Sequence, residues 1–109
     1  MSEQGFTLTS PAFAGDGIIP AAFTCDGENT SPELKWMHAP GGTRSFVLIV
    51  DDPDAPNGTF THWVLFDIPA DTKHLPGEVS GLGVKGRNDF QQVGYRGPCP
   101  TPNHGQHRY

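Results

Sequence analysis

The sequence predicts an all-β fold built from two packed antiparallel sheets. Short apolar segments recur along its 109 residues, and 14 glycines and 11 prolines separate them. Turn signals at intervals of about ten residues are typical of short strands joined by rigid loops. No segment has both the length and the periodicity of a core helix. A chain of this length is expected to form one domain, with a single core, over residues 1–109.

The first part of the chain predicts two short strands. Residues 6–9 alternate between apolar and polar, which predicts an edge strand. Residues 18–24 are apolar but interrupted by Pro20, so we expect a poorly paired segment there. Residues 34–37 alternate again. We expect them to pair with the next strand, over residues 46–50.

An acidic turn follows that next strand. Residues 46–50 are five consecutive apolar residues, which predict a strand buried on both faces. They lead into Asp-Asp-Pro-Asp-Ala-Pro at 51–56. Each proline fixes its own φ and favours extended backbone before it, so Asp52 and Asp54 should be held stiffly. The bond between Ala55 and Pro56 is a candidate for the cis form, because the turn must reverse with both carboxylates on one side.

A histidine stands close to this turn. Residues 60–68 predict a strand in which His62 has the parity of Val64, Phe66 and Ile68. The imidazole should therefore point to the apolar side of the strand. The two aspartates and this histidine are expected to converge at the mouth of the sandwich.

The remainder of the chain carries weaker patterns. Residues 70–75 predict one helical turn before Pro76. Residues 81–94 include four glycines and few apolar side chains. They predict a surface loop with at most a short hairpin.

Composition and charge exclude several classes of protein. The formal net charge is −5 and the seven basic residues are scattered, which argues against a nucleic-acid partner. The longest wholly apolar run, 46–50, is too short for a transmembrane segment. Residues 1–4 show no basic region before an apolar one. We therefore predict a cytoplasmic protein.

The two cysteines leave two interpretations open. Cys25 and Cys99 both lie in loops, without the spacing of a zinc site or a redox motif. A cytosolic chain more often carries two free thiols than a disulfide, and free thiols are our expectation.

Several motifs together resemble the phosphatidylethanolamine-binding protein family. They are the acidic turn at 51–56, Thr-His-Trp at 61–63, Gly-Pro-Cys-Pro at 97–100 and Gly-Gln-His-Arg-Tyr at 105–109. Three more resemble its bacterial and archaeal branch, often labelled YbhB/YbcL-like or Raf-kinase-inhibitor-like: Thr-Cys-Asp-Gly at 24–27, Ser-Pro-Glu-Leu-Lys-Trp at 31–36 and Asn-Asp-Phe at 88–90. The resemblance covers nearly the whole chain and implies a Greek-key β-sandwich.

The resemblance also implies a ligand pocket. Its positions in this sequence are Asp52, Asp54, Pro56, His62, Gly97, Pro98, His107 and Tyr109. A phosphate beside carboxylates needs imidazole and backbone N–H donors, and a carboxylate that shares a proton with a phosphate oxygen. Gly97 is the expected backbone donor because it has no side chain to shield its N–H. Tyr109 would wall the pocket and donate its hydroxyl.

The expected function is therefore non-enzymatic binding, without a cofactor, of phosphate or a phosphate-like group. A phospholipid head group such as phosphoethanolamine, a nucleotide and a phosphopeptide all present one. The family labels suggest a protein kinase or protease as an inhibited target.

Three other functions are weighed against this one. A hydrolase would use the aspartates and histidines as acid and base, or Cys99 with His104 or His107, but Cys99 lies between two prolines and no Gly-x-Ser-x-Gly motif is present. A metal site would combine His104 and His107 with His62 and Asp52. A pure protein–protein interaction module would use the rigid loops instead of the pocket.

The resemblance stops at the last residue. Family members continue beyond the His-Arg-Tyr motif with another strand and usually a C-terminal helix, so the domain over 1–109 is expected to lack both. We expect either a fragment of a longer product or a second chain, as in a homodimer, that covers the open sheet edge.

Overall fold

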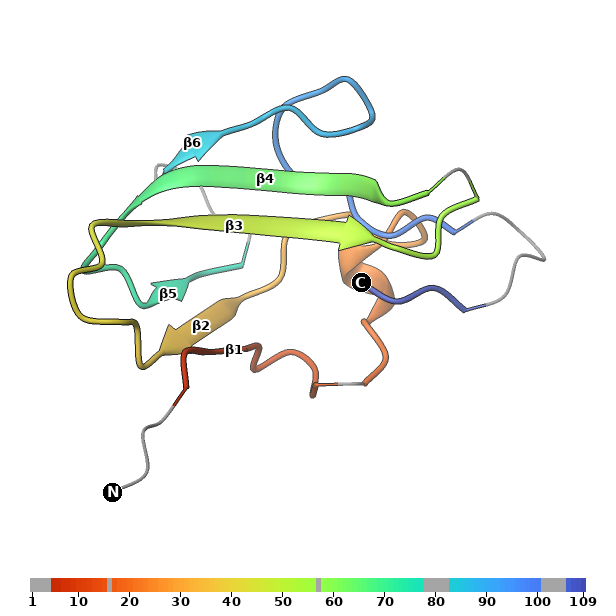
Figure 1. Cartoon of the computed structure of the whole chain (residues 1–109). Helices are drawn as coiled ribbons and strands as arrows, with labels where there is room; N and C mark the ends of the chain where they lie inside the picture. The colour runs from red at the N-terminus through yellow and green to blue at the C-terminus, as the bar shows by residue number, and fades with distance from the viewer. Residues whose placement is uncertain (1–4, 16, 57, 78–82, 101–105) are drawn as a thin grey trace.

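The computed structural model describes residues 5–15, 17–56, 58–77, 83–100 and 106–109. The elements in chain order are β1 (Thr7–Thr9), the 3-10 turn η1 (Ala21–Phe23), β2 (Leu34–Met37), β3 (Ser45–Asp52), β4 (Phe60–Pro69), β5 (His74–Leu75) and β6 (Val84–Lys85) (Figure 1). Within the described ranges η1 is the only helical segment. The predicted all-β class is confirmed.

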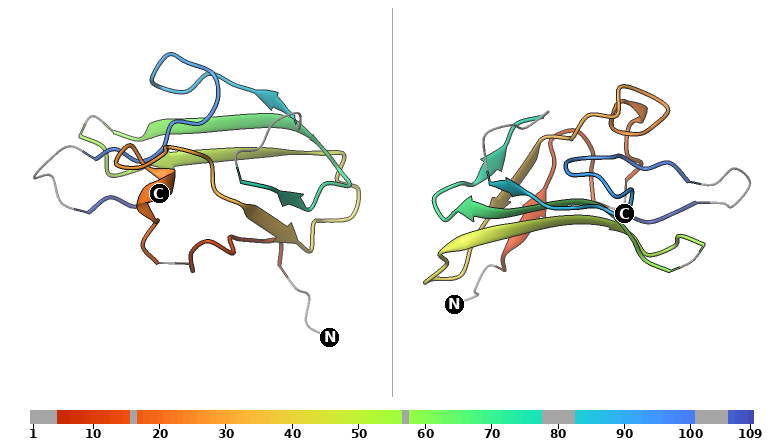
Figure 2. Two further views of the ribbon diagram at one scale, coloured as in Figure 1. Left: turned by 180° about the vertical axis from the view of Figure 1, so that it is seen from behind. Right: turned by 90° about the horizontal axis from the view of Figure 1, so that it is seen from above.

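The strands form two three-stranded antiparallel sheets. One has the order β1-β2-β5 and the other β3-β4-β6. The chain crosses between the sheets after β2, after β4 and after β5, and the two sheets lie one beside the other (Figure 2). The predicted sandwich of two antiparallel sheets is confirmed.

The expected pairing of β2 with β3 is wrong. Leu34 of β2 pairs with Leu75 of β5, whereas β3 belongs to the other sheet. Trp36 and Phe46 instead meet across the interior, with ring centroids 5.3 Å apart. Both strands bury alternate residues, so each has one apolar face, and facing each other hides both faces.

β3 is likewise buried on one face, not on two as its continuous apolar run predicted. Val47 and Ile49 are 61% and 57% exposed, whereas Phe46 and Leu48 belong to the core. The other apolar face of this strand lies at the surface.

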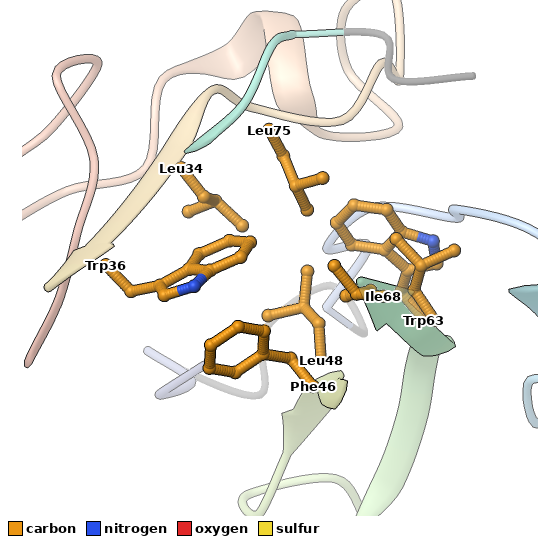
Figure 3. Packing of buried hydrophobic residues seen from close by; sticks show 8 residues of the cluster. Leu34, Trp36, Phe46, Leu48, Trp63, Ile68 and Leu75 are labelled. Carbon is orange, nitrogen blue, oxygen red and sulfur yellow. The ribbon is translucent and has the colours of Figure 1, made fainter. Parts of the chain in front are cut away.

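The core fills the space between the sheets (Figure 3). Its buried members are Leu34, Trp36, Phe46, Leu48, Trp63, Leu65, Ile68 and Leu75. Five come from the long strands β3 and β4 at positions that face the other sheet, among them Leu65 and Ile68, and the short strand β5 contributes Leu75. The β3–β4 hairpin therefore provides the rigid frame at whose end the acidic turn stands.

Two bulges in β4 change which residues face the core. Trp63 pairs with Val50 and Thr61 with Asp51, so His62 is an extra residue in β4. His62 and Trp63 are consequently both buried, at 4% and 2% exposure. The side chain of His62 points inward as predicted, but for a different reason. The bulge turns it inward, and not the strand face that we expected it to share with Val64.

Two local expectations are also corrected. Residues 70–75 do not form a helical turn: Thr72 N–H donates to Pro69 O in a tight turn, and His74 and Leu75 form β5 instead. None of the described peptide bonds is cis, so the bond between Ala55 and Pro56 is trans.

Candidate functional site

The acidic turn is fixed by its own hydrogen bonds. Asp52 ends β3 and is 3% exposed, and its Oδ1 accepts a hydrogen bond of 2.8 Å from Asp54 N–H. Gly58 closes the turn by donating to Ala55 O at 3.1 Å, with a φ of 102° that favours glycine. This trans turn reverses the chain and delivers Phe60 opposite Asp52 at the start of β4.

The last residues of the chain bind both carboxylates. His107 Nδ1 donates to Asp52 Oδ2 at 2.5 Å, and the two side chains are 2% and 5% exposed. Arg108 Nε donates to Asp54 Oδ2 at 2.9 Å, and its Nη2 donates to Oδ1 at 2.8 Å. Hydrogen bonds from Arg108 hold the pKa of Asp54 well below its usual range. Each aspartate therefore has its own basic partner.

His62 is held in one orientation. Its Nδ1 donates to Arg96 O at 2.8 Å, which leaves Nε2 as the ring nitrogen able to meet a ligand. The rings of Phe60, Phe90 and Tyr109 surround the imidazole, with centroids 5.2, 5.4 and 5.6 Å away. An aromatic wall thus encloses the histidine beside the acidic turn.

A pocket of about 370 Å³ opens at this end of the sandwich. It is lined by Asp52, Ala55, Pro56, Gly58, Thr59, Phe60, Phe90, Cys99 and His107. Three of the eight residues indicated by the resemblance line it directly: Asp52, Pro56 and His107. His62 and Tyr109 stand next to its aromatic wall.

Tyr109 contributes a neutral phenol. Burial, followed by the charge of Asp52 and a hydrogen bond to it, raises the pKa of Tyr109 to about 12. Its hydroxyl therefore keeps its proton at neutral pH. The ring also stacks on His107, with centroids 6.4 Å apart.

Gly97 and Pro98 hold the loop that contains Cys99 against residues 23–29. Gly97 N–H donates to Asn29 Oδ1 at 2.8 Å, so the donor that we expected to face a ligand is bound within the chain. A Cβ on Gly97 would lie 2.0 Å from Phe23 O, which explains why this close approach requires glycine. Pro98 O accepts from Cys25 N–H at 3.0 Å.

The expectation of two free thiols is wrong, because Cys25 and Cys99 form a disulfide with their Cα atoms 5.3 Å apart. The loop contacts of Gly97 and Pro98 bring the two segments together although the cysteines are 74 positions apart. Cys99 lines the pocket as half of this bond, so it is not the free nucleophile that a thiol hydrolase needs. Of the proposed metal ligands, His104 lies outside the described residues. Among the residues that are described, no three His, Cys, Asp or Glu side chains gather as a metal site.

Sequence reasoning missed several residues that build the site. Asn88 is 2% exposed; its Oδ1 accepts from Phe90 N–H and Gln92 N–H at 2.9 and 3.2 Å, and its Nδ2 donates to Gly94 O at 3.0 Å. The loop predicted to lie on the surface is thereby folded around one buried amide, which places Phe90 against the pocket. The Asn-Asp-Phe motif was the available signal for this. For Arg108, the available signal was its position between His107 and Tyr109, which the family resemblance had both indicated as pocket residues.

The fold and the pocket define a β-sandwich binding protein, and the comparisons identify its family. The family profile described as phosphatidylethanolamine-binding protein matches residues 9–109. The chain belongs to the phosphatidylethanolamine-binding protein family. It is 54% identical over 106 residues to the UPF0098 protein of Aquifex aeolicus, a match that covers 92% of this chain and 61% of that protein. It is 49% identical over 108 residues to the UPF0098 protein of Methanothermobacter thermautotrophicus, with 94% and 70% covered.

Solved structures of bacterial relatives have the same fold. YbcL of Escherichia coli, described as a member of the mammalian PEBP family, superposes with a TM-score of 0.87 at 34% identity, covering 97% of this chain and 72% of YbcL. The PEBP homologue CT736 of Chlamydia trachomatis gives a TM-score of 0.86 at 33% identity, covering 93% and 69%. These matches confirm the bacterial and archaeal branch. In the part of the chain that the structure describes, no helix is long and apolar enough to cross a membrane.

Proposed function

We propose that this domain binds small phosphate-like anions, without catalysing a reaction, in the pocket beside Asp52 and His107. The observation that carries the proposal is the pocket of about 370 Å³ whose buried aspartate is already paired with a buried histidine. Phosphate, phosphoethanolamine, nucleotides and phosphopeptides share the chemical group that such a site recognises.

The local charges support an anion despite the two aspartates. Arg108 neutralises Asp54 through a bidentate contact, and Asp52 accepts a hydrogen bond from His107, so both carboxylates already have partners within the chain. The His62 ring is fixed beside the aromatic wall of the pocket by its bond to Arg96 O, and a protonated Nε2 would be a donor for a phosphate oxygen. A protonated oxygen of the ligand would in turn donate to Asp52.

A ligand-observed NMR screen tests the proposal and separates the sources of the anion. Phosphate, phosphoethanolamine, AMP and a short phosphopeptide are each titrated against the parent chain, His62→Ala and His74→Ala. His74 is the matched control, because it is an exposed histidine on the other sheet, paired with Glu33. We expect binding that survives His74→Ala and is lost in His62→Ala. Absence of binding to the folded parent, or equal binding by His62→Ala, would reject the site.

Protein partners are proposed in addition to the small anion. Inhibition of a protein kinase or protease follows only from family labels, and a target captured equally well by His62→Ala would favour a pure interaction module over head-group binding. A homodimer is proposed because β3 pairs only with β4 within the described residues. Sedimentation over a range of concentrations tests it.

The cytoplasmic location stays a prediction. The bond between Cys25 and Cys99 weighs against it, because disulfides persist mainly in oxidising compartments. Thiol labelling of the protein in fractionated cells of its native host decides the point. Recovery of the oxidised protein only outside the cytoplasm would overturn the prediction.

A further inference from the structure

A second pocket lies at the opposite end of the sandwich. It has a volume of about 260 Å³ and is lined by Trp36, Met37, His38, Ala39, Phe46, Ala70 and Lys73. None of these residues lines the pocket at Asp52. Phe46 and Asp52 stand towards the two ends of β3, roughly 20 Å apart along the strand, so the two pockets are separate.

The floor of this second pocket contains an unusual buried donor. Within the described part of the chain, Trp36 Nε1 is the one buried side-chain nitrogen or oxygen without a hydrogen-bond partner. Trp36 is 6% exposed, and its nitrogen lies on the edge of the indole that faces Phe46 (Figure 3). Leaving a buried N–H unpaired is costly. Because Nε1 has almost no accessible surface, a ligand can offer it an acceptor only when the side chains that cover it move apart.

The charges around this pocket have one sign. Lys73 and His38 are its only ionisable lining residues, and no carboxylate is among them. The backbone of Lys73 is fixed next to that of Trp36, because its carbonyl accepts a hydrogen bond of 3.0 Å from the backbone N–H of Trp36. His38 is held in left-handed backbone, with a φ of 62°, directly after β2. A cationic rim therefore stands over an aromatic floor.

We propose that this second pocket binds a small carboxylate with an apolar body, such as a short-chain fatty acid or an aromatic acid. The carboxylate meets the Lys73 ammonium and supplies the acceptor that Trp36 Nε1 lacks, and the hydrocarbon lies against Trp36, Met37 and Phe46. An inorganic anion has no group to fill the apolar floor. The proposal is independent of anion binding at Asp52 and extends beyond it.

Two-dimensional NMR of the indole N–H groups tests the proposal, with hexanoate as the probe. The chain contains two tryptophans, and Trp63, 2% exposed in the core, serves as the internal reference. Hexan-1-ol has the chain without the charge, and acetate has the charge without the chain. Lys73→Ala removes the cation, and Lys35→Ala is its matched control, because Lys35 is an exposed lysine of β2 outside this lining.

We expect hexanoate to shift the Trp36 Nε1–H resonance saturably and to leave that of Trp63 in place. Affinity should fall roughly tenfold in Lys73→Ala, and by a similar factor for hexan-1-ol, and should be unchanged in Lys35→Ala. Both variants change exposed side chains, and the dispersion of their spectra confirms folding. No saturable shift of Trp36 up to the solubility of hexanoate, equal affinity in Lys73→Ala, or equal affinity for hexan-1-ol would overturn the proposal. Persistence of the shift in saturating phosphate is expected, and its abolition by phosphate would place the ligand in the other pocket and refute this one.

Discussion

Asp52 and Asp54 are close in sequence, yet they depend on different partners. Asp52 is buried against His107, whereas Asp54 is partly exposed and bound by Arg108, which is always charged. The acidic turn indicated both carboxylates. It could not indicate Arg108, because a contact between residues 54 positions apart depends on where the folded chain carries its last residues.

At the residue scale, Asp54→Asn should change how stability responds to acid. The pKa of Asp54 is held down in the folded chain, so the unfolded chain takes up a proton first as the pH falls. The contribution of this pair is therefore complete above about pH 4 and declines below it. Urea unfolding between about pH 6 and pH 3 at low salt should show a shallower loss in the variant. Because Arg108 is 79% exposed, high salt should reduce the difference, and identical pH slopes at low salt would contradict the pairing.

The two tyrosines give a second prediction at this scale. Burial raises the pKa of Tyr95 and of Tyr109 to about 12, so the folded chain holds their protons more tightly than the unfolded chain does. Their contribution to stability is complete below about pH 10 and is lost as the pH rises towards 12. Tyrosinate absorbance should therefore develop near pH 12 in the folded protein and near pH 10 in urea. Ionisation of either phenol near pH 10 without unfolding would contradict the buried environments.

At the scale of elements, the apolar pattern indicated the strands but not the bulges. The long strands β3 and β4 begin and end within one or two residues of their predicted limits. The register of the strands could not be predicted from the sequence. One extra residue at His62, or at Asp67 with its φ of 54°, reverses which of the following side chains face the core, and a prediction from alternating residues assumes that no such bulge occurs. The 88–94 loop was missed for another reason: its order comes from one buried side chain, Asn88, and not from an apolar pattern.

Asn88→Ala tests this loop. The substitution leaves the N–H groups of Phe90 and Gln92 and the carbonyl of Gly94 without their partner. We expect the free energy of unfolding to fall by about 2–4 kcal/mol, measured by urea denaturation. Val93→Ala is the control, because this side chain in the same loop is 65% exposed and should change stability by less than about 0.5 kcal/mol. Equal stability of the two variants would show that Asn88 does not organise the loop.

At the scale of the whole molecule, the pocket is assembled from distant parts of the chain. The acidic turn, the 88–94 loop, the disulfide and the last residues meet at one end of the sandwich, and Figure 1 shows the C-terminus near the end of β3. Composition and periodicity do not predict such tertiary contacts between segments that are distant in the sequence. The family resemblance indicated eight positions, and three of them, Asp52, Pro56 and His107, line one pocket.

The disulfide should stabilise the whole domain by closing a long loop. Cys25 and Cys99 are separated by 74 positions, and cross-linking so long a segment restricts the unfolded chain strongly. Reduction should lower the free energy of unfolding by about 2–5 kcal/mol, measured by urea denaturation with and without dithiothreitol. The Cys25→Ser/Cys99→Ser variant should match the reduced protein and should not respond to the reductant. Superimposable curves for the oxidised and reduced parent would show that the bond adds no stability.

The central claim is an anion pocket that depends on His62, and calorimetric titration with sulfate tests it most directly. Sulfate has the shape of phosphate and a fixed charge, so a change in affinity reports the protein. At one pH, we predict that the parent and His74→Ala bind sulfate with the same affinity and that His62→Ala binds it roughly tenfold more weakly. Equal affinity in His62→Ala, or no binding to the folded parent, would contradict the account.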